Sequence, residues 1–246
     1  MSEERATMRE DEQVEILSRV YIFEPLDKEE IRQLLRRNSE VSVEAGQVFY
    51  APWERDGKLF VLKKGRVRLY RTEGAHEFTL EVLDVGAVFG EMAFTPHRLR
   101  DAYAEATEPS VVFVMERAEV ERLILEKPVV GLRMLELLSE RLRYYETRME
   151  DITLKEVPAR LASLILFLVE HEGVQIPGEI RIPTSYTHEH LGTMVGANRE
   201  AVTRAFGRLQ DEGAVQIRRR IIHVEDVAAL ERAAGRLLEG EGEGPS

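Results

Sequence analysis

The chain has 246 residues, 43% of them hydrophobic, and a formal net charge of −11 at pH 7. This length suits two domains, and the composition can fill hydrophobic cores, which excludes a disordered chain. The sequence contains no cysteine, which excludes disulfides, thiol redox chemistry and cysteine-bound iron–sulfur clusters.

The first 37 residues begin with a highly charged stretch. Residues 1–11 are expected to form a frayed arm, and they lack the apolar centre of a signal peptide. No run reaches the roughly 18 apolar residues that span a bilayer, so we expect a cytoplasmic protein with no membrane partner. From residue 12 to 37 the apolar spacing is helical with a break at Pro25, after which Asp27 and Glu30 form a capping box.

Between residue 41 and about residue 115 the apolar spacing changes to two, which is typical of strands. Glycines separate the runs at intervals of 8 to 12 residues, a rhythm that predicts an all-β barrel or sandwich. The expected strands contain Val41–Val43, Val48–Tyr50, Leu59–Leu62, Val67–Leu69, Phe78–Val82, Val88 and Val111–Val114.

Two helices are predicted next, a short one over residues 117–126 and a long one over residues 129–153. The long one carries apolar residues at alternating spacings of three and four, which is the seam of a two-stranded coiled coil. A helix packed on its own domain also shows an apolar stripe, but arginine and glutamate dominate the other faces here and favour a dimer. The seam residues are Leu135, Leu138, Leu142, Tyr145, Met149 and Ile152.

A second domain begins at about residue 154, after a hinge at residues 153–157, with a helix opened by Pro158. Within it, Thr187 is a candidate N-cap for a short helix that carries Leu191 and Val195 on one face. Gly196 then supplies the positive φ that a sharp turn requires. These features predict the first helix and the turn of a helix-turn-helix.

Asn198 caps the second helix of this motif, whose first turns carry Arg199, Glu200 and Arg204. In a helix-turn-helix these turns enter the major groove, where Arg donates to guanine and Glu accepts from cytosine. The alternative is a solvated face with an Arg–Glu pair at helical spacing. Residues 184–224 hold six Arg against four acidic residues, a local charge of +2 that supports the DNA interpretation.

Residues 214–217 and 220–224 are β-prone and flank a predicted turn at Arg218-Arg219, as in the wing of a winged helix. Arg218, Arg219 and Arg220 are candidates for phosphate contacts, and a solvated turn is the alternative for each. A last helix over residues 227–238 precedes a Gly/Glu tail, residues 239–246, that is expected to be disordered.

The segment LGTMVGANREAVTRAFGRLQDEG, residues 191–213, resembles the DNA-binding motif of the cyclic-AMP receptor protein/FNR (CRP/FNR) family of bacterial transcription regulators. The resemblance extends over roughly residues 12–231. It implies an α+β chain with a cyclic-nucleotide-binding-like β-roll (a jelly roll) over 12–128. A dimerisation helix over 129–153 and a winged helix-turn-helix over 154–238 would follow.

The resemblance places the family's phosphate-binding cassette at residues 88–106, where Gly90, Glu91 and Arg100 match. Asp101 stands at the family's serine position, and a carboxylate has no donor for a phosphate and repels it. We therefore expect an internal Glu91–Arg100 ion pair that holds the loop closed. Tyr145 stands where nucleotide-binding members present a hydroxyl to adenine, a second departure. The candidates for an effector pocket are therefore Gly90, Glu91, Arg100, Asp101 and Tyr145, and we do not expect cyclic AMP to bind there.

Other cofactors and activities find little support. His188 and His190 are one residue apart and do not face one metal ion, so no zinc site is expected. His76 lies near the position of a haem ligand in one branch of the family, but a single turn histidine is usually just exposed. No nucleophile set appears at catalytic spacing, so no enzymatic activity is predicted.

The sequence therefore predicts a homodimeric regulator that reads a TGTGA-N6-TCACA-like palindrome on double-stranded DNA, without cyclic AMP and with RNA polymerase as a partner. The alternatives are a regulator that needs cyclic AMP or another small molecule, a ligand-binding module without DNA function, and an enzyme in the β-roll cavity. Further residues of the predicted DNA surface are Thr187, His188, Asn198 and Thr203.

Overall fold

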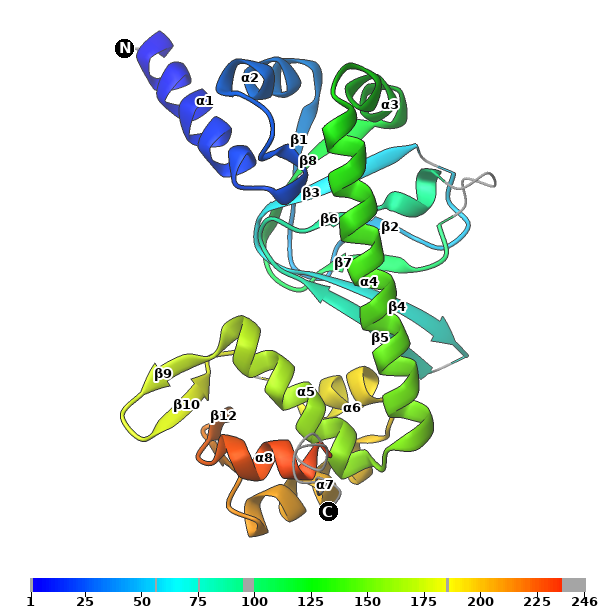
Figure 1. Ribbon diagram of the computed structural model, residues 1–246, viewed down its shortest axis with the longest axis vertical. Coiled ribbons are helices and arrows are strands. Elements are labelled where there is room, and N and C mark those ends of the chain that lie inside the picture. The colour runs from blue at the N-terminus through cyan, green and yellow to red at the C-terminus, as the bar shows by residue number, and fades with distance from the viewer. Residues whose placement is uncertain (1, 56, 75, 95–99, 185, 236–246) are drawn as a thin grey trace, which may run out of the picture. The chain divides into compact units, whose positions relative to one another are not determined.

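The computed structural model describes residues 2–55, 57–74, 76–94, 100–184 and 186–235, so the whole of the predicted tail, residues 239–246, lies outside the described residues. The chain divides into two compact units, Met1–Leu142 and Arg143–Ser246. The long helix α4 (Pro128–Leu154) contributes to both units, its first half to one and its second half to the other. Helices and antiparallel sheets alternate along the chain as predicted for an α+β protein (Figure 1).

The first unit is built on two antiparallel four-stranded sheets, with strand orders β1-β8-β3-β6 and β2-β7-β4-β5. The strands are short, as the glycine spacing predicts, and Gly65, Gly74 and Gly86 adopt positive φ at the bends between them. The bounds are β1 (Ser39–Val43), β2 (Val48–Tyr50), β3 (Lys58–Lys64), β4 (Val67–Glu73), β5 (His76–Leu83), β6 (Val88–Phe89), β7 (Tyr103–Ala106) and β8 (Ser110–Glu116).

Strand β3 is buried on both faces, which explains its unbroken apolar run. Phe60 and Leu62 point into the core between the two sheets, together with Phe89. Leu59 and Val61 point the other way, into a core closed by helices. A strand that serves two cores cannot alternate between apolar and polar residues, because neither of its faces meets water.

Helices α1 (Ser2–Ser18), α2 (Lys28–Arg37) and α3 (Arg117–Glu126), with the 3₁₀ turn η1 (Tyr21–Phe23), cover this outer face (Figure 1). The predicted capping box of Asp27 and Glu30 is confirmed. The frayed arm predicted for residues 1–11 is wrong, because α1 is helical from Ser2. At the end of this stretch, Asp11 lies 3.0 Å from Arg32 of α2 and Glu10 lies 3.3 Å from Arg36, so these two acids join the helices.

Strand β7 was not predicted from the sequence. Strand β7 pairs with both β2 and β4, but its sequence is Tyr-Ala-Glu-Ala, and alanine and glutamate are poor indicators of a strand. Its two alanines are fully buried, and their small side chains fit the crowded interior between the sheets. The stretch before it contains the 3₁₀ turn η2 (Glu91–Phe94).

In the second unit, α5 (Val157–Glu172) packs against α6 (His188–Val195), α7 (Arg199–Asp211) and α8 (Val227–Ala233). Buried residues occur on several sides of α5, and Pro158 lies in its first turn as predicted. Strands β9 (Val174–Ile176), β10 (Glu179–Ile182), β11 (Val215–Arg218) and β12 (Ile221–Val224) form one antiparallel sheet in the order β11-β12-β10-β9. Among the helices described in both units, none combines the length and hydropathy that crossing a bilayer requires.

Candidate DNA-binding interface

The caps and the turn of the helix-turn-helix are confirmed. The Thr187 hydroxyl accepts from the backbone N–H of His190 at 3.0 Å and begins α6. Gly196 ends that helix in the left-handed region, with φ of 64°. The Asn198 side chain accepts from the N–H of Ala201 at 2.8 Å and begins α7. The chain therefore enters α7 with its first turn capped and its direction set.

Helix α6 and the turn that follows it make a close contact that the sequence analysis missed. A Cβ atom placed on Gly192 would lie 2.5 Å from the carbonyl oxygen of Ala197 in the turn, so only glycine fits at that position. Leu191 and Val195, which the sequence places on one face of α6, are buried, and so are Val202 and Phe206 of α7. The signal available in the sequence was a glycine inside a short helix, where it lowers helix propensity and needs a packing reason.

The first turns of α7 present three charged side chains to solvent. Arg199, Glu200 and Arg204 are all exposed. Within the part of the chain that the structure describes, no ion pair or side-chain hydrogen bond engages their charged groups. The Arg–Glu pair at helical spacing, the alternative to base contact, is therefore not formed. Arg208 on the last turn differs, because its guanidinium lies 3.6 Å from Glu156.

His188 and Thr203 join α6 to α7 beside these charges. The Thr203 hydroxyl donates to the carbonyl oxygen of Arg199 at 2.9 Å, so it accepts from Nδ1–H of His188 at 2.8 Å. The His188 ring also stacks on Phe206 with centroids 5.0 Å apart. Burial, and next the charge of Arg199, lower the pKa of His188 below its ordinary value. The imidazole is thus a neutral, oriented group that fixes the start of α7.

The wing turn lies one residue later than predicted. Strand pairing ends at Arg218 and Ile221, so Arg219 and Arg220 form the two-residue turn, whereas the sequence analysis placed it at Arg218-Arg219. Both turn residues have positive φ, 52° and 66°. Positive φ at both central positions is the geometry of a type I′ hairpin, whose twist matches that of the strands. The pairing of Val215 with Val224 sets this register.

The three wing arginines have different surroundings. Arg218 donates to Glu179 at 2.9 Å and is also paired with Glu225. Glu179 in turn lies 2.8 Å from His223, and although burial opposes it, these donors lower the pKa of Glu179. Arg219 and Arg220 are exposed, and neither is ion-paired with another described residue. Two cations at the tip of the hairpin are therefore available to a partner.

A groove of about 410 Å³ connects the helix-turn-helix to the wing. His188 and Arg199 lie along one side, and Arg220 and Ile222 lie on the wing side. Thr187, the cap of α6, also lines it. The groove thus gathers three of the predicted DNA-surface residues from the helices and one from the wing. Arg199 and Arg220 outnumber Glu189 in its lining, so its charge suits a phosphate of a nucleic acid backbone.

The cassette arginine of the first unit points into the β-roll. Arg100 is only 1% exposed, and its guanidinium lies over the ring of Tyr50, 4.2 Å from the centroid. It donates to the carbonyl oxygens of Gly90 and Lys58. Gly90 has φ of 90°, and a Cβ there would meet Arg100 Nη1 at 2.8 Å. The predicted match of Gly90 and Arg100 is therefore a packed pair in which only glycine fits.

The predicted Glu91–Arg100 ion pair is wrong. Glu91 instead pairs at 3.1 Å with Arg141 of α4, which also lies 3.1 Å from Glu81 of β5. Asp101 does not neutralise Arg100 either, because its carboxylate pairs with Arg71 of β4. Both of these carboxylates therefore pair with arginines that lie far from them in the sequence, Arg141 and Arg71.

Models of two known domains match the chain over most of its length. The Crp-like helix-turn-helix domain matches residues 159–233, and the cyclic nucleotide-binding domain matches residues 40–127. The cyclic AMP receptor protein of Thermus thermophilus is 32% identical over 177 residues, covering 72% of this chain and 79% of the relative. The chain belongs to the CRP/FNR family of transcription regulators.

Other members of the CRP/FNR family extend the match over nearly the whole chain. A CRP-like cAMP-activated global transcriptional regulator of Mycobacterium tuberculosis is 27% identical over 222 residues, covering 89% of this chain and 99% of the relative. The structure of the CRP/FNR-family transcriptional regulator TTHA1359 from Thermus thermophilus aligns with a TM-score of 0.68 and 25% identity, covering 80% of this chain and 98% of that one.

The predicted site residues fall into these two family domains. Those from Thr187 to Arg220 lie in the Crp-like helix-turn-helix domain, and those from Gly90 to Asp101 lie in the cyclic nucleotide-binding domain. Tyr145 lies between them on α4, with its ring centroid 5.6 Å from that of Tyr144. The four cassette residues therefore belong to the first unit, whereas Tyr145 belongs to the second unit together with the helix-turn-helix.

Proposed function

We propose that this chain is a homodimeric, sequence-specific regulator that reads a TGTGA-N6-TCACA-like palindrome without cyclic AMP. The observation that carries the proposal is the exposed trio Arg199, Glu200 and Arg204, which no ion pair engages among the described residues. Arg199 and Arg204 would donate to guanines, and Glu200 would accept from the cytosine opposite one of them. The groove and the two turn residues of the wing, Arg219 and Arg220, would take the adjoining phosphates.

The proposed dimer rests on the seam of α4. Leu135, Leu142 and Met149 are 62%, 60% and 66% exposed in the single chain, and all lie at seam positions. A row of large apolar side chains this exposed is stabilised by a second copy of the same helix. Two copies related by a twofold axis would present their α7 helices to half-sites about one helical turn apart.

Independence from cyclic AMP is proposed from the cassette. A relative in the family is a cAMP-activated regulator, so the cassette of this chain is compared with what binding of cyclic AMP would require. Here Arg100 already donates to two carbonyl oxygens, and Asp101, paired with Arg71, offers no hydroxyl where the cyclic phosphate would lie. A nucleotide would have to displace those contacts and approach a carboxylate. RNA polymerase is proposed as a partner on the basis of family membership.

The test is fluorescence anisotropy with a labelled TGTGA-N6-TCACA duplex at a stated salt concentration, against a scrambled duplex, with and without cyclic AMP. Selective binding that cyclic AMP does not change is the expected result. Selective binding only with cyclic AMP would overturn the argument from Asp101. Binding no tighter than to the scrambled duplex would contradict the proposed operator.

Arg204→Ala is the variant that tests base contact. It should weaken binding to the palindrome by about 1–3 kcal/mol and leave the scrambled duplex nearly unaffected. Arg208→Ala, on the last turn of the same helix, is the matched control and should preserve the preference for the palindrome. Equal losses on both duplexes for Arg204→Ala would show that it contacts only phosphate.

Leu142→Glu tests the dimer. A carboxylate in the seam would face its own copy across the axis, so the variant should be a monomer by light scattering and should lose binding to the palindrome. Glu140→Lys changes charge two residues away, on the opposite side of the heptad, and should remain dimeric. A dimer that persists with Leu142→Glu would move the interface off α4.

A further inference from the structure

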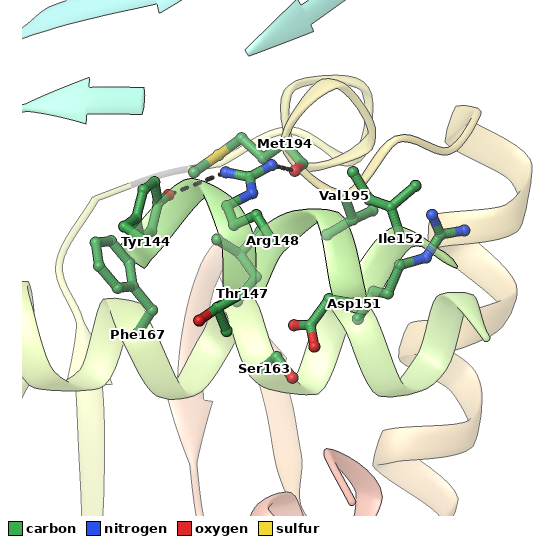
Figure 2. A pocket seen from close by; sticks show the side chains of 11 residues that line it. Tyr144, Thr147, Arg148, Asp151, Ile152, Ser163, Phe167, Met194 and Val195 are labelled. Atoms are coloured by element: carbon green, nitrogen blue, oxygen red, sulfur yellow. Dashed lines mark hydrogen bonds between the residues drawn. The ribbon is translucent and has the colours of Figure 1, made fainter. Parts of the chain in front are cut away.

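A small cavity of about 110 Å³ is formed by residues of the second unit that differ from those of the DNA-binding groove (Figure 2). Its walls come from the C-terminal half of α4, from α5 and from the last turn of α6. All the residues that line it belong to that one unit, so the cavity is formed within a single compact body. Neither the proposed function nor the family match assigns it a role.

The lining combines an apolar base with cationic groups. Leu164, Phe167 and Val195 provide apolar surface, and the Thr147 and Ser163 side chains are polar. Figure 2 shows side chains from both long helices converging on the space beside the α6 turn. This combination is typical of sites that hold a small molecule by a few polar contacts and cover its apolar part.

The charge around the cavity is positive. Arg148 and Arg160 line it, and Lys155 beside it donates to Ser163 at 3.1 Å. The acid in the lining is Asp151, whose carboxylate lies 2.7 Å from the Lys155 ammonium and is neutralised by it. Among the described residues no ion pair engages Arg160, so its charge makes the cavity favour an anion.

Arg160 has an unsatisfied donor. Its Nε is sealed from solvent, and no hydrogen bond from it reaches a described residue. A buried donor on a cation without an acceptor is destabilising, and native structures rarely keep one without a reason. A carboxylate is the group that best fits a guanidinium, because it accepts two parallel N–H donors.

We propose that this cavity binds a small organic anion, a carboxylate with a short apolar tail. The carboxylate would accept from Arg160 and Arg148, and the tail would lie against Leu164, Phe167 and Val195. A volume of this order accommodates about six non-hydrogen atoms. The proposed ligand is smaller than cyclic AMP and differs from it in chemical class.

Occupancy would act on the helix-turn-helix through Arg148. This side chain donates to the Tyr144 hydroxyl at 3.0 Å and to the carbonyl oxygen of Met194 (Figure 2). Met194 lies two residues before Gly196, in the last turn of α6. An anion that drew Arg148 away would release the tie between α4 and this turn. The effect on DNA rests on the proposed function, whereas the binding itself does not.

The binding is tested on the full-length protein with methionine methyl groups labelled with ¹³C, because Met194 lines the cavity and reports on it directly. Titration with butyrate should shift the Met194 methyl resonance with a Kd on the order of 1 mM. Butyramide, the uncharged counterpart, should not shift it, and chloride and phosphate at the same concentration distinguish a general anion effect. An equal response to all four compounds, or no response to butyrate at about 20 mM, overturns the proposal.

Arg160→Gln should weaken butyrate binding about tenfold or more while leaving thermal stability unchanged, since among the described residues Arg160 Nε has no hydrogen bond to lose. Arg143→Gln, an exposed arginine on the same helix as Arg148, is the matched control and should bind as the wild type does. If Arg160→Gln binds butyrate normally, the anion site is elsewhere. Operator binding is then measured with and without saturating butyrate. A change in operator affinity in the wild type that is absent in Arg160→Gln supports coupling between the anion site and DNA binding. No change in either protein contradicts the coupling but not the anion site.

Discussion

Replacing the wing turn Arg219-Arg220 by Asn-Gly should stabilise the fold and weaken DNA binding at the same time. Both residues are held in the left-handed region, with φ of 52° and 66°. That region costs an ordinary L-residue roughly 1 kcal/mol or more, so relieving two sites gains roughly 2 kcal/mol. Glycine also raises the entropy of the unfolded chain, which reduces this gain in stability by roughly 0.5–1 kcal/mol. The net expectation is about 1 kcal/mol, seen as a higher denaturation midpoint.

The same substitution removes two exposed cations from the hairpin tip. If both contact phosphates, the slope of log K against log salt should fall by about 2, with equal losses on the palindrome and on the scrambled duplex. Salt-dependent anisotropy measures the slope, and urea unfolding measures the stability. The two effects have opposite signs, which no general loss of folding can produce.

Arg218→Gln is the control for this experiment. Its guanidinium pairs with Glu179 and Glu225, so its removal should lower stability and leave the salt slope nearly unchanged, the reverse pattern. The reasoning is refuted if Asn-Gly lowers stability, since the turn would then not be type I′. An unchanged salt slope would show that the tip does not reach DNA.

Two further predictions concern the helix-turn-helix. Gly192→Ala should destabilise by about 1–3 kcal/mol, because its Cβ would lie 2.5 Å from the Ala197 carbonyl, whereas Gly207→Ala, with open space around it, should stabilise by about 0.5–1 kcal/mol in urea unfolding. Similar effects at both glycines would contradict the close contact. Because its pKa is lowered, His188 binds protons less readily in the folded state than in the unfolded chain, so stability falls as pH drops through its ordinary value of 6.5. His188→Gln should lose less stability than the wild type between about pH 7.5 and pH 5.5, and parallel curves would exclude this linkage.

The sequence predicts the helix-turn-helix closely because its signals are local. Thr187, Gly196 and Asn198 act on backbone groups within four residues of themselves, so residue type and spacing determine the geometry. The β-roll strands can also be predicted from the sequence, because the alternation of apolar and polar residues and the glycines between strands are properties of neighbouring residues. Strand β7 is missed because its alanines are selected by the space between sheets, which no local pattern encodes.

The contacts of charged side chains could not be predicted in the same way. Glu91 lies closer in sequence to Arg100 than to Arg141, yet it pairs with Arg141, which the long helix brings to the loop. The turn of the wing is misplaced by one residue because three consecutive arginines give no signal for positive φ. The position of the turn is set by the register of β11 and β12, which depends on pairs such as Ile217 with Ile222.

Strand β1 has a consequence for the order in which the first unit can be assembled. Residues Ser39–Val43 pair with Ser110–Val114 of β8, which lies between β1 and β3 in the sheet. On a growing chain β1 therefore has no neighbour until β8 has been synthesised, and β3 lacks its longest pairing until the same moment. The roll closes in one late, long-range step, and during translation its apolar strands depend on the chain's own helices, or on chaperones, for cover.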